Sequence, residues 1–237
     1  MKILAIIPAR GGSKRIPNKN IKDFCGKPLI AYTVEQAKQC SFIDRVIVDT
    51  DSEDIATLAK NYGAEVPFLR PVELAGDDAQ VVDSVVRVLD RLLQEEKYEP
   101  THVLILQTTS PLRESEDIEA CMSLMQETDA TTVLTVAPTH PRLYHLDGEQ
   151  NLVLGNKYTN ESTNMQAWRP AFLLNGCFVY MVEASALRKE KKIITERTKA
   201  VICDKWRSVD LDTMEEWVLA EFLYAHKKEL EDNLKKT

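Results

Sequence analysis

Residues 7–22, with the sequence IPARGGSKRIPNKNIK, combine two adjacent glycines with five cationic side chains directly after a short apolar run. Gly11 and Gly12 let the backbone turn sharply and expose its N–H groups, because a Cβ at either position would hinder a ligand. Cationic side chains around such a turn supply charge-assisted hydrogen bonds to phosphate oxygens. The segment therefore predicts a phosphate-binding loop. Its cations are Arg10, Lys14, Arg15, Lys19 and Lys22.

The overall composition makes this loop a local feature. The chain has 237 residues and a formal net charge of -7, which argues against a protein that binds nucleic acid through a broad basic face. A solvated charged loop is the alternative, but two glycines after a first strand favour a small anionic ligand. Neither the GxxxxGK[ST] pattern nor GxGxxG occurs here, which disfavours a P-loop kinase and a dehydrogenase.

A pair of carboxylates stands near the end of the chain, in the segment SVDLDT. Asp210 and Asp212 are two positions apart, so on an extended segment both side chains point to the same face. Hard oxygen ligands on one side suit a Mg²⁺ ion that also takes phosphate oxygens. Asp212 could also cap the last helix, with Glu215 completing an arrangement like a capping box. We expect a metal role for both residues and a dual role for Asp212.

Strand-like and helix-like runs alternate along most of the chain and must position these residues. Apolar runs at 3–9, 45–50, 65–69, 102–107 and 131–137 read as strands. The longer segments between them carry apolar residues at helical spacing, and Ser52 is the expected N-cap of the helix that ends at Gly63. This order predicts a three-layer α/β fold with a mostly parallel sheet and right-handed crossovers. Ligands of such sheets bind beyond the carboxyl ends of the strands. The opening loop, residues 49–51 and residues 107–110 should therefore line one site.

The alternation breaks at residues 138–170, which are rich in turn signals and short alternating runs. They form either a surface loop or a small β-rich arm that packs against a second subunit. A structureless loop of this length is rare in a compact domain, so we expect the arm. On an isolated subunit it would expose the apolar side chains of Leu143, Leu146, Val153, Met165 and Trp168. The α/β domain would then comprise residues 1–137 and 171–237, with a final helix from Thr213.

Several motifs in register carry a resemblance to a known family. They span most of the chain, and together they are far more specific than any one of them. The chain resembles the acylneuraminate cytidylyltransferases (CMP-sialic acid synthetases). The motifs are PARGGSKRIPNKNI, VIVDTDSEDIATLAKNYGAEV, LRPVELAGDDA, LILQTTSPLRESEDIEA, NGCFVY and SVDLDTMEEWVLAE.

The resemblance implies a Rossmann-like nucleotidyltransferase fold and the reaction of CTP with N-acylneuraminate to give CMP-N-acylneuraminate and pyrophosphate. It implies Mg²⁺ on Asp210 and Asp212, which act in catalysis with Arg10 and Lys14. It also implies a homodimer with a shared sugar site. The implied nucleotide-binding residues are Arg10, Gly11, Gly12, Ser13, Lys14, Lys19, Asn20 and Arg70, and the implied sugar-binding residues are Gln107 and Asn175.

This sequence also departs from the family pattern. Met165-Gln166 stands where many sialic-acid enzymes carry Arg-Gln, so the sugar carboxylate would be held by Arg142 or Arg169, or the acidic sugar is a different one, such as legionaminic or pseudaminic acid. Thr108 stands where the family usually has proline. Val179 occupies the place of an aromatic residue, which appears one position later.

Two other functions remain open from the sequence. One is a related enzyme that uses another nucleotide or sugar, and the other is a non-catalytic nucleotide-sensing protein. The pair of carboxylates argues against a pure binding protein, which has less need of a metal site. Five widely spaced cysteines without a CxxC pair, and the absence of a membrane-length apolar stretch, predict a cytoplasmic location.

Overall fold

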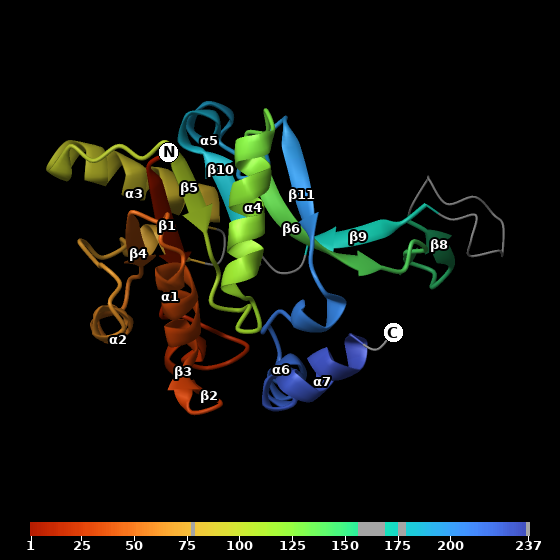
Figure 1. Cartoon of the computed structure of the whole chain (residues 1–237). Coiled ribbons are helices and arrows are strands. Elements are labelled where there is room, and N and C mark those ends of the chain that lie inside the picture. Colours follow the sequence, from red (N-terminus) through yellow and green to blue (C-terminus); the bar gives the residue numbers. More distant parts are fainter. Residues whose placement is uncertain (77–78, 156–168, 175–178, 236–237) are drawn as a thin grey trace.

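The computed structural model describes residues 1–76, 79–155, 169–174 and 179–235, and its centre is a seven-stranded sheet (Figure 1). The strands lie in the order β11-β6-β10-β5-β1-β4, and β9 pairs with β6 outside this path. Their bounds are β1 (Ile3–Pro8), β4 (Arg45–Asp49), β5 (His102–Ile105), β6 (Thr132–Thr139), β9 (Ala171–Leu174), β10 (Tyr180–Glu183) and β11 (Thr198–Ile202).

Helices connect these strands, as the alternating pattern predicts. Their bounds are α1 (Leu29–Gln39), α2 (Glu53–Asn61), α3 (Val81–Glu96), α4 (Ser115–Glu127), α5 (Ala184–Glu190), α6 (Met214–Ala225) and α7 (Lys227–Leu234). Short 3-10 helices cover Lys19–Ile21, Val72–Leu74 and Lys205–Arg207. Two small hairpins consist of β2 (Asp23–Phe24) with β3 (Lys27–Pro28), and β7 (Tyr144–Leu146) with β8 (Leu152–Leu154).

The sheet is mostly parallel, with one internal exception. β1 runs parallel to β4 and β5, and β11 runs parallel to β6, but β10 runs antiparallel to both β5 and β6. The predicted mostly parallel sheet is thus confirmed, with β10 and the outlying β9 as its antiparallel strands. The reason is the path of the chain: β9 turns back along β6, so the chain re-enters the sheet from the carboxyl end of β6 and must run the opposite way.

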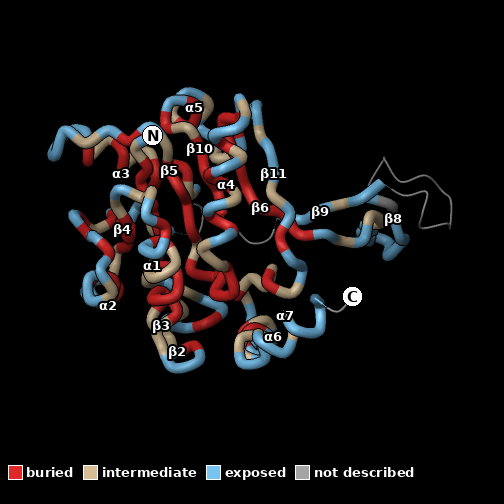
Figure 2. Tube along the Cα trace, in the orientation of Figure 1, coloured by how far each residue is buried: buried red, intermediate tan, exposed pale blue. Residues whose placement is uncertain are grey.

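Alternate side chains of the central strands enter two separate cores. In β1, Ile3, Ala5 and Ile7 pack in a core shared with α1, α2 and α4, whereas Leu4 and Ile6 pack in a core shared with α3 and α5. Figure 2 shows the strands of the body as a buried layer between the helices. This arrangement confirms the predicted three layers.

A third apolar cluster fastens the opening loop to the last part of the chain. Ile16 and Phe24 pack with Leu211 and Trp217, and the rings of Phe24 and Trp217 meet edge to face at 5.6 Å between centroids. Leu211 lies between the two aspartates predicted to bind metal. The packing therefore holds these aspartates next to the cationic loop.

Helix ends follow local signals, with one correction. Ser52 caps α2, accepting a hydrogen bond from the N–H of Ile55, as expected. Helix α6 is capped by Thr213 with Glu216 and not by Asp212 with Glu215, because the Thr213 hydroxyl stands in extended backbone directly before the first turn. The carboxylate of Asp212 is therefore available for other contacts. The final helix expected from Thr213 is in fact two helices, α6 and α7.

Another difference concerns residues 65–69, which were expected to form a strand. Glu65 makes a single parallel bridge to Ile47, and no ladder continues. Pro67 has no N–H to donate, which explains why the pairing stops.

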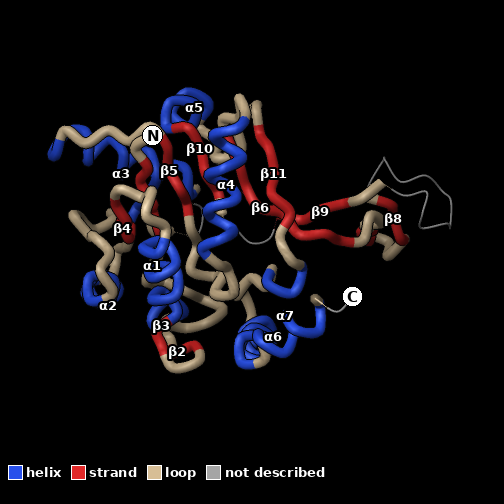
Figure 3. Tube along the Cα trace, viewed as in Figure 1, coloured by secondary structure: helices blue, strands red, loops and turns tan. Residues whose placement is uncertain are grey.

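Residues 138–155 and 169–174, which include the end of β6 and all of β9, project from the body of the molecule (Figure 3). The far half of β6 pairs with β9, and the β7–β8 hairpin lies beyond this pair. Leu143, Leu146 and Val153 are exposed in the single chain, as the sequence suggested. Met165 and Trp168, which belong to the same prediction, lie outside the described residues.

Candidate functional site

A cavity of about 600 Å³ opens at the carboxyl ends of β1 and β5. It lies between the opening loop, the segment after β5, the segment before α3, and the segment before α6. The lining residues are Pro8, Arg10, Ser13, Lys14, Arg15, Ile16, Lys19, Asn20, Arg70, Leu74, Gly76, Ala79, Gln80, Val81, Gln107, Thr108, Thr109 and Asp212.

The cavity gathers most of the residues that the sequence singled out. Those that line it are Arg10, Ser13, Lys14, Lys19, Asn20, Arg70, Gln107 and Asp212. Asp210 lies behind Asp212, in the same turn. Arg142 and Arg169 belong to the projecting part of the chain and do not line the cavity, and Asn175 lies outside the described residues.

The glycines of the opening loop differ from their expected role. The N–H of Gly11 donates a 2.8 Å hydrogen bond to Asp51 Oδ1, so it is turned toward the protein. A Cβ on Gly11 would lie 3.2 Å from the Cβ of Ser52, whereas a Cβ on Gly12 would meet nothing within 4 Å. Gly11 therefore permits a close approach to the segment after β4. The expectation that its N–H faces a ligand is wrong.

Asn20 joins two walls of the cavity. It is buried, and its Nδ2 donates to the carbonyl oxygen of Arg10 at 2.8 Å. Its Oδ1 accepts a 2.6 Å hydrogen bond from the hydroxyl of Thr108. Both ends of the amide are therefore engaged by the protein, and Asn20 supports the shape of the loop.

Lys19 and Asp212 line the cavity where the opening loop meets the segment before α6. Lys19 Nζ donates to the carbonyl oxygen of Leu211 at 2.7 Å and lies 3.3 Å from Asp212 Oδ1. Arg15 Nη1 lies 3.0 Å from Asp212 Oδ2. One carboxylate thus stands between two cations.

Asp210 is the more buried of the two aspartates. Burial raises the pKa of its carboxyl, and Asp212 raises it further, while neighbouring Thr109 and Lys19 act in the opposite direction. Its Oδ1 is buried without a hydrogen-bond partner, and so is the hydroxyl of Thr109. Removing a carboxylate oxygen from water without a partner is costly, so this oxygen is suited to a ligand or cation.

The protein supplies few acidic or soft ligands around this point. Within the described ranges, no group of three or more His, Cys, Asp and Glu side chains is placed to hold a metal ion. A cation bound at Asp210 and Asp212 would therefore need further oxygen ligands from water or substrate. Mg²⁺ commonly takes that kind of site, with one or two carboxylates.

A buried arginine supports the segment after β5, and the sequence did not single it out. Arg113 donates from Nη1 to the carbonyl oxygen of Gln107 at 3.2 Å, from Nη2 to the hydroxyl of Thr33 at 2.9 Å, and from Nε to Gln36 Oε1 at 3.1 Å. Burial lowers the pKa of its guanidinium. These bonds hold the strand end that carries Gln107, whose own side chain remains at the cavity.

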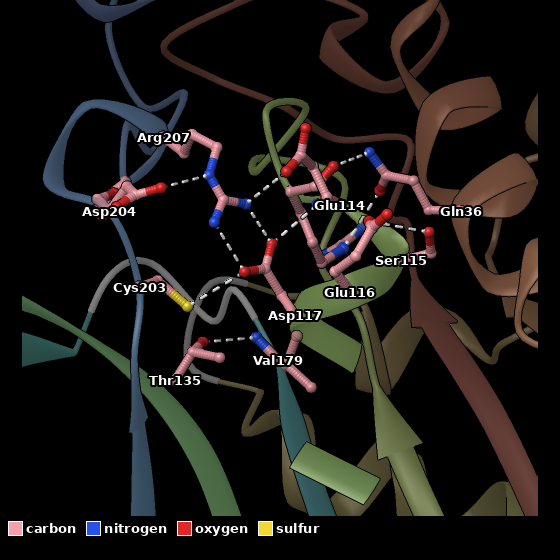
Figure 4. Close-up of polar contacts among 12 residues, drawn as sticks. Gln36, Glu114, Ser115, Glu116, Asp117, Thr135, Val179, Cys203, Asp204 and Arg207 are labelled. Atoms are coloured by element: carbon pink, nitrogen blue, oxygen red, sulfur yellow. Dashed lines mark hydrogen bonds and ion pairs between the residues drawn. The ribbon is translucent and has the colours of Figure 1, made fainter. Parts of the chain in front are cut away.

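A second buried arginine anchors the segment before Asp210 (Figure 4). Arg207 Nη2 lies 2.9 Å from Asp117 Oδ1, Nη1 also contacts the Asp117 carboxylate, and Nη1 lies 3.4 Å from Glu114 Oε2. Burial alone would lower the pKa of Arg207, but its hydrogen bonds and attraction to Asp117 raise it. The network fixes the turn before Asp210 to the start of α4.

A second hollow of about 380 Å³ adjoins the cavity and shares Gln80, Val81 and Gln107 with it. Most of its wall is apolar, and two lysines stand beside the apolar side chains. The further lining residues are Val82, Ile105, Tyr180, Lys191, Lys192, Ile193 and Ile194.

Comparison with known sequences agrees with this geometry. Residues 4–230 match the family model described as Cytidylyltransferase. The chain is 36% identical to CMP-N,N'-diacetyllegionaminic acid synthase of Legionella pneumophila over 234 residues, covering 94% of this chain and 96% of that protein. It is 33% identical to pseudaminic acid cytidylyltransferase of Campylobacter jejuni over 227 residues, covering 94% and 97%. It is 29% identical to N-acylneuraminate cytidylyltransferase of Streptococcus agalactiae, covering 92% of this chain and 52% of that protein.

Among solved structures, the chain resembles a CMP:2-keto-3-deoxy-manno-octonic acid synthetase complexed with CTP. The TM-score is 0.71 at 18% identity, and the alignment covers 96% of this chain and all of the other. At this identity the likeness concerns the fold alone. In the described part of the chain, no helix is long and apolar enough to cross a bilayer.

Proposed function

This chain belongs to the cytidylyltransferase family, and on that premise we propose that it joins CMP from CTP to an N-acylated nonulosonic acid, with release of pyrophosphate. The observation that carries the proposal is the cavity at the carboxyl edge of the sheet. One small space there is bordered by Arg10, Lys14, Arg15 and Lys19, although the chain as a whole is acidic.

The cationic wall suits the triphosphate of CTP. Lys14 and Arg10 would hold the phosphates, and Arg10 also donates to the carbonyl oxygen of Gly76 at 3.2 Å, which links the loop to the segment before α3. The anomeric hydroxyl oxygen of the sugar forms a bond to the α-phosphorus. The bond from that phosphorus to the bridging oxygen breaks, pyrophosphate leaves with the electron pair, and the hydroxyl proton passes to solvent. Positioning and charge neutralisation are the main demands of such a step.

The sugar would occupy the second hollow, with Gln107 between it and the nucleotide. Among the relatives that match nearly the whole chain, those named for legionaminic and pseudaminic acids are 36% and 33% identical, and the one named for N-acylneuraminate is 29% identical. We therefore propose that the sugar is a legionaminic or pseudaminic acid. N-acylneuraminate is the second candidate, favoured by a 43% identical match over 125 residues to the N-acylneuraminate cytidylyltransferase of Escherichia coli.

The carboxylates of Asp210 and Asp212 fit a Mg²⁺ ion, because both are hard oxygen ligands and Asp210 Oδ1 is buried without a partner. When bound there, Mg²⁺ would neutralise charge on the phosphates and the developing leaving group. Ion pairs with Lys19 and Arg15 orient the carboxylate of Asp212.

We further propose that two chains pair through residues 138–170 and complete each other's sugar site. The exposed apolar side chains of this region support a partner, and a second copy is the proposed occupant. Arg142 or Arg169 would then reach the sugar carboxylate in the other subunit. We propose a cytoplasmic location, with which the four described cysteines, all without disulfides, are consistent.

A pyrophosphate-release assay tests the function. CTP, UTP, GTP and ATP are each offered with N,N'-diacetyllegionaminic, pseudaminic and N-acetylneuraminic acids, and with 2-keto-3-deoxy-manno-octonic acid as the eight-carbon control. Release with CTP and a di-N-acylated nine-carbon acid is the expected result. Binding of CTP without release from any sugar would support a nucleotide-sensing protein, and preference for another nucleotide would overturn the choice of CTP.

A further inference from the structure

Asp49 ends β4 and is a fully buried carboxylate behind the cavity, which it does not line. Its Oδ2 accepts a 2.8 Å hydrogen bond from Arg70 Nε, and its backbone oxygen accepts another, also 2.8 Å, from Arg70 Nη2. The hydroxyl of Ser84, on α3, donates to the same Oδ2. A single residue therefore holds one whole edge of the Arg70 guanidinium.

The opposite edge of Arg70 is turned to the cavity. Arg70 lines the cavity although its side chain is only 7% exposed, and its Nη1 makes no hydrogen bond to any part of the chain that the structure describes. A guanidinium is planar, so fixing Nε and Nη2 also fixes the direction in which Nη1 points. The direction of the Nη1 donor of Arg70 is thus set by Asp49, which does not line the cavity and so cannot contact a ligand there.

A second guanidinium adds charge to this group. Arg87 Nη1 lies 3.6 Å from Asp49 Oδ1, and Arg87 Nη2 donates to the carbonyl oxygen of Leu69 at 2.7 Å. Asp49 Oδ1 and Arg87 Nη1 are both buried without a hydrogen bond. Two arginines share one carboxylate, so the group carries a net positive charge behind the wall that faces the cavity.

We propose that Asp49 is a positioning residue for the nucleotide, acting through Arg70, and that Ser84 fixes Asp49 for this purpose. The inference rests on the proposed function, because it assumes that the cavity takes CTP. Arg70 offers its free N–H groups to an acceptor on the nucleotide, in an orientation that is set before binding. Little side-chain freedom is then lost when the nucleotide binds.

The competing interpretation is a buried ion pair that serves folding alone. It predicts that changes at Asp49 or Ser84 lower stability and leave the handling of nucleotide and sugar unchanged. The positioning role predicts that these changes weaken the binding of CTP selectively, and that this effect disappears when Arg70 is replaced. A double-mutant cycle separates the two.

Ser84→Ala is the main variant, because Asp49→Asn leaves two buried guanidinium groups without a carboxylate and should strongly destabilise the fold. We expect Ser84→Ala to raise the KM for CTP and the calorimetric Kd for CTP by about tenfold, as for the loss of one hydrogen bond to a charged group. The kcat and the KM for the sugar should stay within about twofold. In an Arg70→Gln background, Ser84→Ala should have no further effect on the KM for CTP.

Thr131→Ala is the matched control, since Thr131 is buried and its hydroxyl is bonded to Thr195 at the opposite edge of the sheet. It should lower stability without changing the KM for CTP. If Ser84→Ala behaves like this control, or has its full effect in the Arg70→Gln background, the positioning role is overturned while the proposed function stands. Failure of the wild-type chain to bind CTP overturns both.

Discussion

The hydroxyl of Thr108 donates a 2.6 Å hydrogen bond to Asn20 Oδ1 across 88 positions of sequence. Asn20 in turn donates to the carbonyl oxygen of Arg10. The segment after β5 and the cationic loop after β1 are therefore joined by a buried chain of polar contacts. The link therefore depends on the hydroxyl of Thr108.

We expect Thr108→Val to lower the free energy of unfolding by about 1–3 kcal/mol, because it leaves Asn20 Oδ1 buried without a donor while changing little volume. The KM for CTP should rise as well, since Asn20 supports the loop. Urea denaturation and steady-state kinetics measure the two effects. Thr128→Val, at the partly exposed end of α4, is the control and should cost less than about 1 kcal/mol. An unchanged stability in Thr108→Val would contradict the link.

For the opening loop, we expect Lys14→Ala or Arg10→Ala to reduce kcat/KM for CTP by about tenfold or more, because each removes a charge from the cavity wall. Lys27→Ala is the matched control. Its ammonium lies 2.7 Å from Glu35 and does not line the cavity, so its effect should be small. Equal losses at all three positions would mean that the loop acts as a diffuse basic patch.

Asp210→Asn tests the proposed metal site. It removes one charged ligand and changes little volume, so turnover should fall by about two orders of magnitude or more while the circular dichroism spectrum is retained. Excess chelator should abolish turnover of the wild-type chain, and added Mg²⁺ should restore it. Full activity of the variant, or of the wild type in chelator, would remove the metal assignment.

The raised pKa of Asp210 gives a separate prediction about stability without metal. Protonation of this carboxyl stabilises the folded chain, so its contribution is fully present below the unfolded pKa and is lost as pH rises through the folded pKa. Asp210→Asn cannot titrate. In chelator, we expect the variant to be more stable than the wild type at about pH 7, and the difference to shrink as the pH falls toward about 4. A difference that does not vary with pH would mean that burial does not raise this pKa.

The exposed apolar side chains of residues 138–155 and 169–174 predict a two-fold dimer. Light scattering at assay concentration should give the mass of two chains, and Leu146→Glu with Leu152→Glu should shift it toward one. The control is Val72→Glu, an exposed apolar residue on the body. A fully active single chain would refute the dimer.

Mixed dimers test whether the sugar site is shared. One chain lacks Arg142 and Arg169, and the other lacks Asp210. If the site spans the interface, each variant is inactive alone, and mixing them restores part of the activity. No recovery after confirmed subunit exchange would place the whole site within one chain.

The order of strands and helices could be predicted because each element has its own apolar period, and the carboxyl-edge rule correctly brought Lys14 and Gln107 to one cavity. The same rule was wrong for residues 49–51, which do not line the cavity because they pack behind it against the opening loop and Arg70. The direction of β10 could not be predicted from the sequence. An apolar run of four to eight residues reads the same in either direction, and only the return of the chain along β9 decides it.

The contacts between charged groups also could not be predicted from the sequence. Arg70 and Arg113 look like ordinary surface arginines, but their burial follows from packing of distant segments. Asp212 and Thr213 are both good capping residues, and only the backbone conformation shows that Thr213 takes that place. Where several residues of the right type are adjacent, tertiary geometry makes the choice.

The pairing of β6 has a consequence for synthesis of the chain. In the part that the structure describes, β6 pairs with β9, β10 and β11, which are all made after residue 170. β1 pairs with both β4 and β5, so these three strands can come together much earlier in synthesis. A nascent chain that has emerged from the ribosome only as far as the end of β6 therefore carries this strand with both edges unpaired. Such a segment is the kind that chaperones cover and that aggregates when synthesis stalls.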